Sequence, residues 1–503
     1  MIDATSVLCA VLAVLVAAFF WSRHRHSYWS KRGIPTASGR LPFVGNMGPV
    51  VFRQKSFFDH FNHMGREHQD LGYSGVYMWG QHMLLVTDPE MIKQVVCKDF
   101  SSFHDRGIPT TERDPLSLHL FNLSGTKWRN LRNRLSPTFT SGKLKLMFPL
   151  MRDIGDQLST AVASEAKQAG GEVDVQALLG RYATDVIGSV AFGINCNSLE
   201  NPDTEFLAMS RNIFRASPAQ TVRMLLEAVH PKLGQLLPIK LVFNKVHSFF
   251  MDLMRDTVEY REKNKVVRND FVHLLMQLRD QELGHADPEN HMEMTPGLMA
   301  AQAFIFFIAG LDNVSNSVSF CLHQMAQDKD LQQRVADEVR GVIQKHDGEL
   351  TYQALKEMDL LNRVLLEGLR LWGPIGLVMR KCNETTMVGD VLVEKGTPVM
   401  MMTDVMHKNP AIYPDPERFD PDRHTAEAKE QRHPYSFMPF GEGPRICIAE
   451  RFAMLEMKLA LAIMVRDFKV SPGPNFEVHP KLEVAAFFPR PQNGFPMHVE
   501  VRE

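Results

Sequence analysis

FGEGPRICIA, residues 440–449, is the stretch of sequence from which the fold and the chemistry of this chain are predicted. Gly441, Gly443 and Pro444 predict a tight loop, and such loops bring backbone N–H groups close to a neighbouring side chain. An apolar helical pattern follows directly, so Cys447 lies just before a helix N-terminus, where negative charge is favoured. A cysteine in these surroundings is suited to bind iron as a thiolate, as in one class of haem proteins. The alternative, a cysteine that only fills space in the core, does not account for the glycines around it.

Length and composition limit the class of protein. Of the 503 residues, 44% are hydrophobic and 23% are charged, which is ordinary for a globular core and excludes wholesale disorder. The net charge of −2 gives no argument for nucleic-acid binding, and no nucleic-acid partner is expected. The six cysteines include no CxxC pair, so neither a disulfide framework nor a structural zinc site is indicated.

The N-terminus is typical of a membrane anchor. No charged residue occurs from Ala4 to Ser22, and about 19 helical residues reach roughly 28 Å, close to the thickness of a bilayer core. Arginine and lysine follow this stretch, and positive charge stays on the cytosolic side. A cleaved signal peptide is the alternative. We expect a transmembrane anchor over residues 1–22, a basic and proline-containing linker over 23–45, and one catalytic domain over 46–503 that faces the cytosol.

The rest of the chain has mainly helical patterns. Helical periodicity dominates from about Lys143 to Leu371, and strand-like runs are short and lie at residues 73–86, 391–402 and 487–501. These patterns predict a mainly α fold with small β-sheets.

One expected helix is unusually long and apolar. Thr295 supplies a helix cap and Pro296 the first helical position, and the pattern continues to about residue 327. The segment 303–310 is apolar on every face, so we expect this helix to be buried. Asp312 then follows inside it, and a buried carboxylate is costly unless it has partners or a chemical role. A hydrogen-bonded aspartate with only a structural role is the alternative.

With these features the chain resembles the cytochrome P-450 superfamily, whose haem-binding signature the stretch 440–449 matches. Three further segments resemble its microsomal branch, which holds insect detoxifying enzymes and mammalian drug-oxidising enzymes. They are LSPTFTSGKLKLMFP at 135–149, AQAFIFFIAG at 301–310 and YPDPERFDPDR at 413–423. The resemblance covers nearly the whole chain after the anchor. It implies the cytochrome P-450 fold, with a single large haem domain and haem b whose iron is bound by the Cys447 thiolate.

The resemblance also implies roles for residues around the haem. Glu367 and Arg370 match the ExxR pair of the family, and Arg423 is expected to complete a structural triad with them. The residues expected to bind the cofactor are Phe440, which shields the sulfur, Trp128, Arg132, Arg380 and Arg445 near the propionates, and Ala309. The substrate pocket is expected to be lined by Phe103, Phe121, Phe304, Ile308, Ala309, Val378, Ala486 and Phe487.

Members of this family insert one oxygen atom of O2 into a lipophilic substrate, and the resemblance implies that reaction here. Asp312 is then the expected proton relay, and Asn313 orients oxygen or water where the family normally has threonine. Asparagine can donate and accept hydrogen bonds but has no hydroxyl. A second departure is Ala449, where the signature usually has glycine.

The electrons are expected to come from another protein. The chain has no G-x-G-x-x-G motif between a strand and a helix that would bind NADPH. The resemblance implies NADPH–cytochrome P-450 reductase as the donor, with a b-type cytochrome as a second partner, at the endoplasmic reticulum membrane. The residues expected to dock the reductase are Lys127, Arg129, Arg134, Lys143 and Lys145. The expected role is metabolism of foreign compounds or of endogenous lipids and hormones.

Two alternative functions remain open from the sequence. A haem-thiolate isomerase or dehydratase that acts on an oxygenated lipid would need no reductase; Asn313 favours it and Asp312 does not. A haem-binding protein without catalytic activity would keep the motif around Cys447 and lose the proton-delivery residues.

Overall fold

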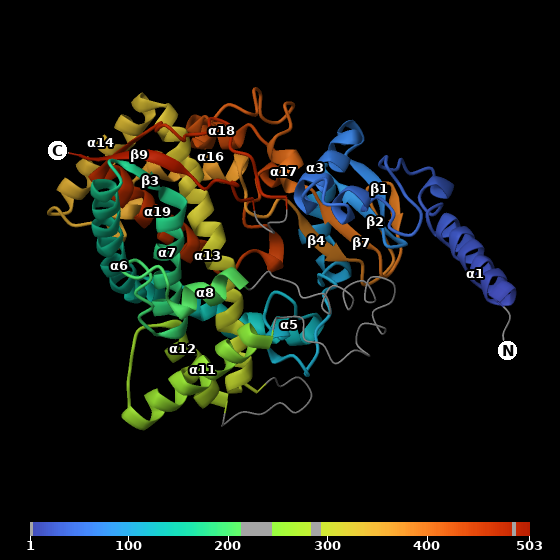
Figure 1. Cartoon of the computed structure of the whole chain (residues 1–503), viewed down its shortest axis with the longest axis horizontal. Coiled ribbons are helices and arrows are strands. Elements are labelled where there is room, and N and C mark those ends of the chain that lie inside the picture. Colours follow the sequence, from blue (N-terminus) through green and yellow to red (C-terminus); the bar gives the residue numbers. More distant parts are fainter. Residues whose placement is uncertain (1–3, 213–243, 283–292, 485–488, 503) are drawn as a thin grey trace.

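A long central helix organises the fold. The computed structural model describes residues 4–212, 244–282, 293–484 and 489–502, and in it α13 (Pro296–Gln327) crosses the helical body (Figure 1). The helix begins as predicted, because the Thr295 side chain accepts a hydrogen bond from the Leu298 N–H at 3.2 Å. Its predicted start and length are therefore confirmed.

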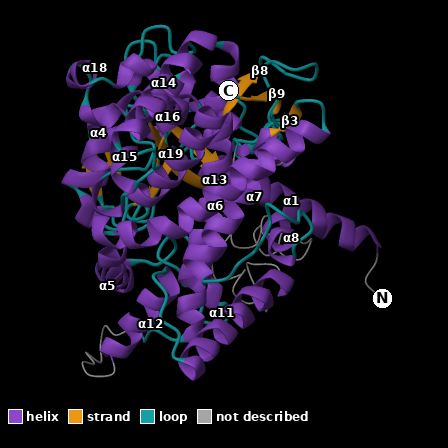
Figure 2. Cartoon of the chain, turned by 90° about the vertical axis from the view of Figure 1, so that its left-hand side faces the viewer, coloured by secondary structure: helices purple, strands orange, loops and turns teal. Residues whose placement is uncertain are grey.

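Four helices pack around α13, namely α7 (Val175–Ile187), α11 (Asn244–Asn264), α16 (Asp359–Leu371) and α19 (Glu450–Asp467). A Cβ atom on Gly310 would lie 2.6 Å from a side-chain carbon of Ile187, so this glycine lets α13 and α7 approach closely. Figure 2 shows α11 together with α12 (Phe271–Glu282) at one end of the helical body.

The remaining described α-helices lie around this core or beside the larger sheet. They are α2 (Gly48–Val51), α3 (Phe57–Glu67), α4 (Pro89–Lys93), α5 (Gly125–Leu135), α6 (Ser141–Gln168), α8 (Glu205–Asn212), α14 (Lys329–Lys345), α15 (Tyr352–Glu357), α17 (Thr403–His407) and α18 (Ala426–Glu430).

The larger sheet lies beside the helical body and has the strand order β1-β2-β7-β4 (Figure 1). Its strands are β1 (Tyr73–Met78), β2 (Gln81–Val86), β7 (Pro398–Met401) and β4 (Val378–Lys381). The pair β1–β2 is an antiparallel hairpin, and its turn is Trp79–Gly80, both in the left-handed region at φ 52° and 76°. Strand β7 joins β2 in parallel, so the two ends of the chain share one sheet.

Two smaller sheets complete the β structure of the described residues. One has the order β3 (Glu172–Asp174), β9 (Pro496–Val501) and β8 (Phe468–Ser471), and the other pairs β5 (Thr386–Val388) with β6 (Val391–Val393). The strand runs predicted at 73–86 and 391–402 are confirmed, each divided by a turn. The run predicted at 487–501 has its strand only at 496–501, and residues 487 and 488 lie outside the described part.

The N-terminal helix α1 (Ala4–Arg25) projects from the sheet side of the molecule (Figure 1). Part of the segment that the sequence predicted as a basic and proline-containing linker, over 23–45, packs against the sheet. Trp29 is completely buried, and its backbone N–H donates to the Tyr77 hydroxyl at 2.9 Å. Its ring covers Gly75, where an added Cβ would lie 2.3 Å from a ring carbon. The packed domain therefore begins before residue 46, because an indole that fills the space over a strand glycine belongs to the core.

Among the described residues, α13 is the one helix that passes a test of length and composition for crossing a membrane. Half of its most apolar stretch is buried inside the protein, which is typical of a core helix.

Replacement of Trp29 tests whether this segment belongs to the domain. Trp29→Ala in the full chain should lower the free energy of unfolding by about 3 kcal/mol, because a fully buried aromatic side chain leaves a cavity. Urea unfolding of the detergent-solubilised protein, followed by circular dichroism, measures the change. The matched control is Trp21→Ala, whose side chain is about half exposed and whose loss should cost less than about 0.5 kcal/mol. Equal effects of the two replacements on the free energy of unfolding would indicate that Trp29 lies in a linker and not in the packed domain.

Candidate functional site

The loop before α19 holds Cys447 in a fixed backbone conformation. The Cys447 N–H donates to the Phe440 carbonyl at 3.0 Å, and the Ile446 N–H donates to the Gly443 carbonyl at 2.9 Å. Gly441 and Gly443 have φ values of 74° and 75°, which only glycine adopts without strain. A Cβ on Gly443 would lie 2.0 Å from the Val96 carbonyl oxygen, so the loop also needs this glycine for its close packing.

Cys447 is an exposed residue with a free thiol. Burial raises the pKa of this thiol, whereas the Ala449 N–H, Arg132 and Arg106 act in the opposite direction. Glu450 adds to the effect of burial, so these three groups reduce the upward shift of the pKa and do not reverse it.

Four arginines gather on one side of this cysteine, and Arg445 is the most firmly held. Its Nε donates to the His104 carbonyl at 2.7 Å and its Nη2 to the Leu123 carbonyl at 2.8 Å. Its guanidinium lies 4.0 Å from the centre of the Trp128 ring. Its Nη1 is buried with no hydrogen-bond partner among the described residues.

The other three arginines of this cluster are Arg106, Arg132 and Arg380. Burial, followed by repulsion from another arginine of the cluster, lowers the pKa of Arg106, Arg380 and Arg445 to about 9. Among the described residues the Nε of Arg380 is buried without a hydrogen-bond partner, and the Asp105 carboxylate lies 3.5 Å from Arg445. Burying so much positive charge is costly without an anion, and the two propionates of haem b fit the cluster.

Arg106 was not predicted from the sequence. Its Nη1 donates to the Phe121 carbonyl at 3.0 Å, its Nη2 donates to the Arg445 carbonyl at 3.4 Å, and its guanidinium lies 4.1 Å from the centre of the Phe121 ring. It lies in a segment without helix or strand, where no periodicity indicates the direction of a side chain.

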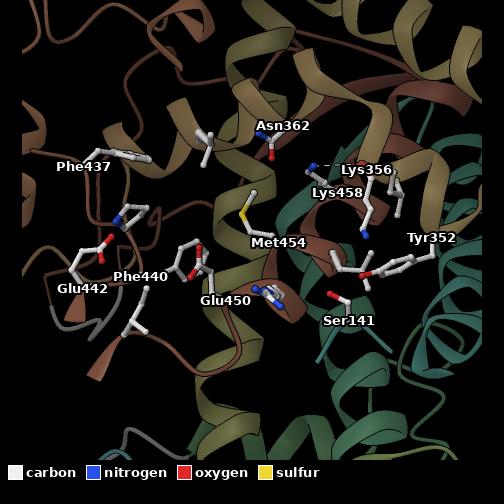
Figure 3. A pocket seen from close by; sticks show the side chains of 17 residues that line it. Ser141, Tyr352, Lys356, Asn362, Phe437, Phe440, Glu442, Glu450, Met454 and Lys458 are labelled. Carbon is white, nitrogen blue, oxygen red and sulfur yellow. Dashed lines mark hydrogen bonds between the residues drawn. The ribbon is translucent and has the colours of Figure 1, made fainter. Parts of the chain in front are cut away.

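The other face of the cysteine loop borders a pocket of about 560 Å³ (Figure 3). Phe440, Glu442 and Glu450 lie at one end of this pocket, and Tyr352 and Lys356 lie at the other. Phe440 is half-buried and lines this pocket.

A buried carboxylate on α16 organises the segment that leads to the cysteine loop. Glu367 receives two hydrogen bonds from Arg370, each 2.8 Å long, and lies 3.5 Å from the Nε of Arg423. The structure also brings in His424, whose Nε2 lies 3.0 Å from the same carboxylate, and the Asp420 N–H at 2.9 Å. Burial would raise the pKa of Glu367, but the hydrogen bonds from Arg370 and His424 lower it to about 2.

A chain of hydrogen bonds connects this ion cluster with the cysteine loop. The Nη1 of Arg370 donates to the His407 carbonyl at 2.9 Å, and the Nε2 of His407 accepts from the Met438 N–H at 3.0 Å. The Met438 carbonyl then accepts from the Gly441 N–H at 3.0 Å. Burial, followed by the charge of Arg370, lowers the pKa of His407 to about 3, so its ring stays neutral and can accept.

Asp312, Asn313 and Ala309 lie together on α13, where the helix becomes partly accessible. Burial raises the pKa of Asp312, although Arg490 acts against this. The Oδ1 of Asn313 is buried and has no hydrogen-bond partner among the described residues, so it is available to a further donor.

The predicted pocket residues differ in burial. Phe103 and Phe304 are 0% and 1% exposed and pack inside hydrophobic clusters. The ring of Phe304 contacts that of Phe250 at a centroid distance of 5.1 Å, with the two ring planes tilted by 57°. Phe121, Ile308 and Val378 keep partial exposure, and Ala486 and Phe487 lie outside the described residues.

The chain resembles known proteins over almost its whole length. A family model described as Cytochrome P450 matches residues 35–496. Probable cytochrome P450 6a14 of Drosophila melanogaster is 37% identical over 486 residues, which are 94% of this chain and 95% of the relative. Cytochrome P450 6a2 of the same organism is 36% identical over 478 residues, covering 92% and 94% of the two chains.

Removing the charge of Glu367 tests its part in the fold. Glu367→Gln should lower the free energy of unfolding at pH 7 by about 3 to 5 kcal/mol, because Arg370 then stays buried without its counter-charge. Asp359→Asn removes an exposed partner of Arg363 and should cost less than about 1 kcal/mol. Urea unfolding measures both changes.

The effect of Glu367→Gln on the free energy of unfolding should depend on pH. The pKa of Glu367 is lowered from 4.5 to about 2, so its contribution is complete above pH 4.5 and is lost as the pH falls toward 2. The difference in the free energy of unfolding between Glu367→Gln and the unaltered chain should shrink as the pH falls from 4.5 toward 2. A constant difference would contradict the role assigned to the Glu367 carboxylate.

Proposed function

Because this chain belongs to the cytochrome P450 family and is therefore a haem-thiolate monooxygenase, we propose that it oxidises lipophilic foreign compounds at the endoplasmic reticulum membrane. The observation that carries the proposal is the Cys447 loop beside four arginines that need an anion. Members of the family use haem b with a cysteine thiolate, and the bound haem supplies the activation of oxygen.

We assign the residues that hold the cofactor from their positions. Cys447 is the iron ligand, and Arg132, Arg380 and Arg445 bind the propionates together with Arg106. The Trp128 ring supports Arg445 by packing against its guanidinium. Phe440 restricts access to the sulfur from the pocket side.

On the oxygen side, Asp312 and Asn313 are the proposed proton-delivery residues. Asp312 is half-buried, and its raised pKa favours the protonated carboxyl that a proton relay needs. The free Oδ1 of Asn313 can accept a hydrogen bond from a water molecule, and its amide can donate one. Asn313 would therefore orient water in place of the usual hydroxyl.

The proposed electron donor is NADPH–cytochrome P450 reductase, with a b-type cytochrome as a second donor. Lys127 and Arg129 on α5 and Lys145 at the start of α6 are exposed, whereas Arg134 and Lys143 are partly buried. Exposed positive charge favours docking of an acidic partner and raises its association rate. The pocket below the cysteine loop lies at this face, since Ser141 at the start of α6 also lines it.

We propose further that α1 anchors the enzyme in the membrane. It is helical over Ala4–Arg25, it has no charged residue before Arg23, and Phe19, Phe20 and Trp21 are exposed on it. The basic residues that follow would keep the catalytic domain on the cytosolic face. With Trp29 in the core, the domain extends from about residue 26 to the C-terminus.

Replacement of Cys447 tests the central assignment. Cys447→Ala should abolish the thiolate-type band in the reduced carbon monoxide difference spectrum and the product formed with NADPH and reductase. Cys9→Ala, which removes the exposed cysteine on α1, should retain both.

A histidine-type spectrum of the unaltered protein, or an unchanged spectrum after Cys447→Ala, would contradict thiolate ligation. Consumption of a lipid hydroperoxide or endoperoxide without any NADPH-dependent oxygen uptake would instead favour the reductase-independent isomerase or dehydratase.

Charge reversal on α5 and α6 tests the docking face. Arg129→Glu and Lys145→Glu should each raise the reductase concentration for half-maximal activity by about threefold at low salt, and less at high salt. Lys263→Glu, an exposed cation at the end of α11, is the control and should change neither value. An equal effect of all three replacements would indicate that the reductase does not dock on α5 and α6.

A further inference from the structure

A short antiparallel ribbon near the C-terminus carries two opposite charges side by side. We define it as residues 481–484 and 489–492; the Glu483 N–H donates to the Arg490 carbonyl at 2.8 Å, and Leu482 pairs with Pro491. The Nε of Arg490 lies 3.9 Å from a carboxylate oxygen of Glu483. These side chains are 52% and 40% exposed, so the two charges border solvent.

A buried asparagine fixes this ribbon to the central helix. Asn316 on α13 is 3% exposed, and its Nδ2 donates to the Pro489 carbonyl at 3.0 Å. Its Oδ1 accepts a hydrogen bond from the Nε2 of Gln176, which lies on α7 and is also buried. Both ends of the Asn316 amide are thus used, and the residue that follows Pro489 has a defined place beside α13.

Asp312 precedes Asn316 by four residues, so both side chains lie on one face of α13. The link between Asn316 and Pro489 therefore places the backbone of the next ribbon residue, Arg490, near the turn of α13 that carries Asp312. The electrostatics agree with this placement. Burial raises the pKa of Asp312, Arg490 lowers it and Glu483 raises it, and these are the charged groups of the described residues that act on this carboxyl.

We propose that Arg490 is a positioning residue for proton delivery, the cationic partner that holds the Asp312 carboxylate at the solvent-facing end of its path. The inference rests on the proposed role of Asp312 as proton relay. When the Asp312 carboxyl gives its proton to the water that Asn313 orients, Arg490 stabilises the resulting carboxylate until solvent at the exposed ribbon returns a proton to it. Glu483 also attracts Arg490, and this weakens the effect of Arg490 on Asp312.

The test compares Arg490→Gln and Arg490→Lys with Lys481→Gln, which removes an exposed cation from the same ribbon. Without the cation the pKa of Asp312 rises, so the pH profile of product formed per NADPH should move to higher pH by about half a pH unit in Arg490→Gln. The share of NADPH electrons released as hydrogen peroxide should rise as well. Arg490→Lys should restore most of the profile, and Lys481→Gln should not move it.

Thermal unfolding supplies a readout that does not depend on turnover. At pH 8 Arg490→Gln should lower the melting temperature more in the unaltered chain than in an Asp312→Asn background. Both chains lose the contact of Arg490 with Glu483, but only the unaltered chain also loses the attraction of Arg490 to the Asp312 carboxylate. The inference is overturned if Arg490→Gln moves the pH profile no further than Lys481→Gln, or if it lowers the melting temperature equally in both backgrounds. Unchanged product per NADPH in Asp312→Asn overturns the relay itself, so the two failures are distinguishable.

Discussion

The carboxylate of Glu367 is charged at a place in the core that solvent does not reach, and several donors from different segments converge on it. A buried charge tolerates little displacement of its partners. Arg370 therefore fixes His407, His407 holds the Met438 N–H, and Met438 holds the Gly441 N–H. The position of the cysteine loop thus depends on an ion cluster that never touches the sulfur, and the loop is defined before any cofactor adds its own contacts.

The two sides of Cys447 are built differently. Below the sulfur, backbone hydrogen bonds and glycines that pack against carbonyl groups leave the loop one conformation. On α13, Asn313 keeps a buried oxygen that the described residues do not satisfy, and burial raises the pKa of Asp312. A ligand site that must hold iron benefits from rigidity, whereas a site that exchanges protons and water needs free hydrogen-bonding capacity. The arrangement therefore matches the proposed division between cofactor binding and proton delivery.

Features that depend on local sequence were predictable. The cap at Thr295, the hairpin at 73–86 and the Glu367–Arg370 pair each follow from spacing along one element. Features that depend on the meeting of distant segments were not. Trp29 follows a basic stretch whose sequence is typical of a linker. Only its packing over Gly75 in the fold shows that it is buried. Phe103 and Phe304 could face a cavity or the core equally well by pattern, and the structure shows both as buried. His424 and Arg106 lie in irregular segments, where no period indicates which side chains converge.

The order β1-β2-β7-β4 has a consequence for biosynthesis. Strand β2 leaves the ribosome more than three hundred residues before its parallel neighbour β7, and β3 must wait for β9 at the end of the chain. Pairing between such distant segments is slow and leaves edges exposed meanwhile. The nascent chain must therefore carry an unfinished sheet beside its N-terminal helix throughout synthesis of the helical body, which makes this edge the place where chaperone protection would matter most.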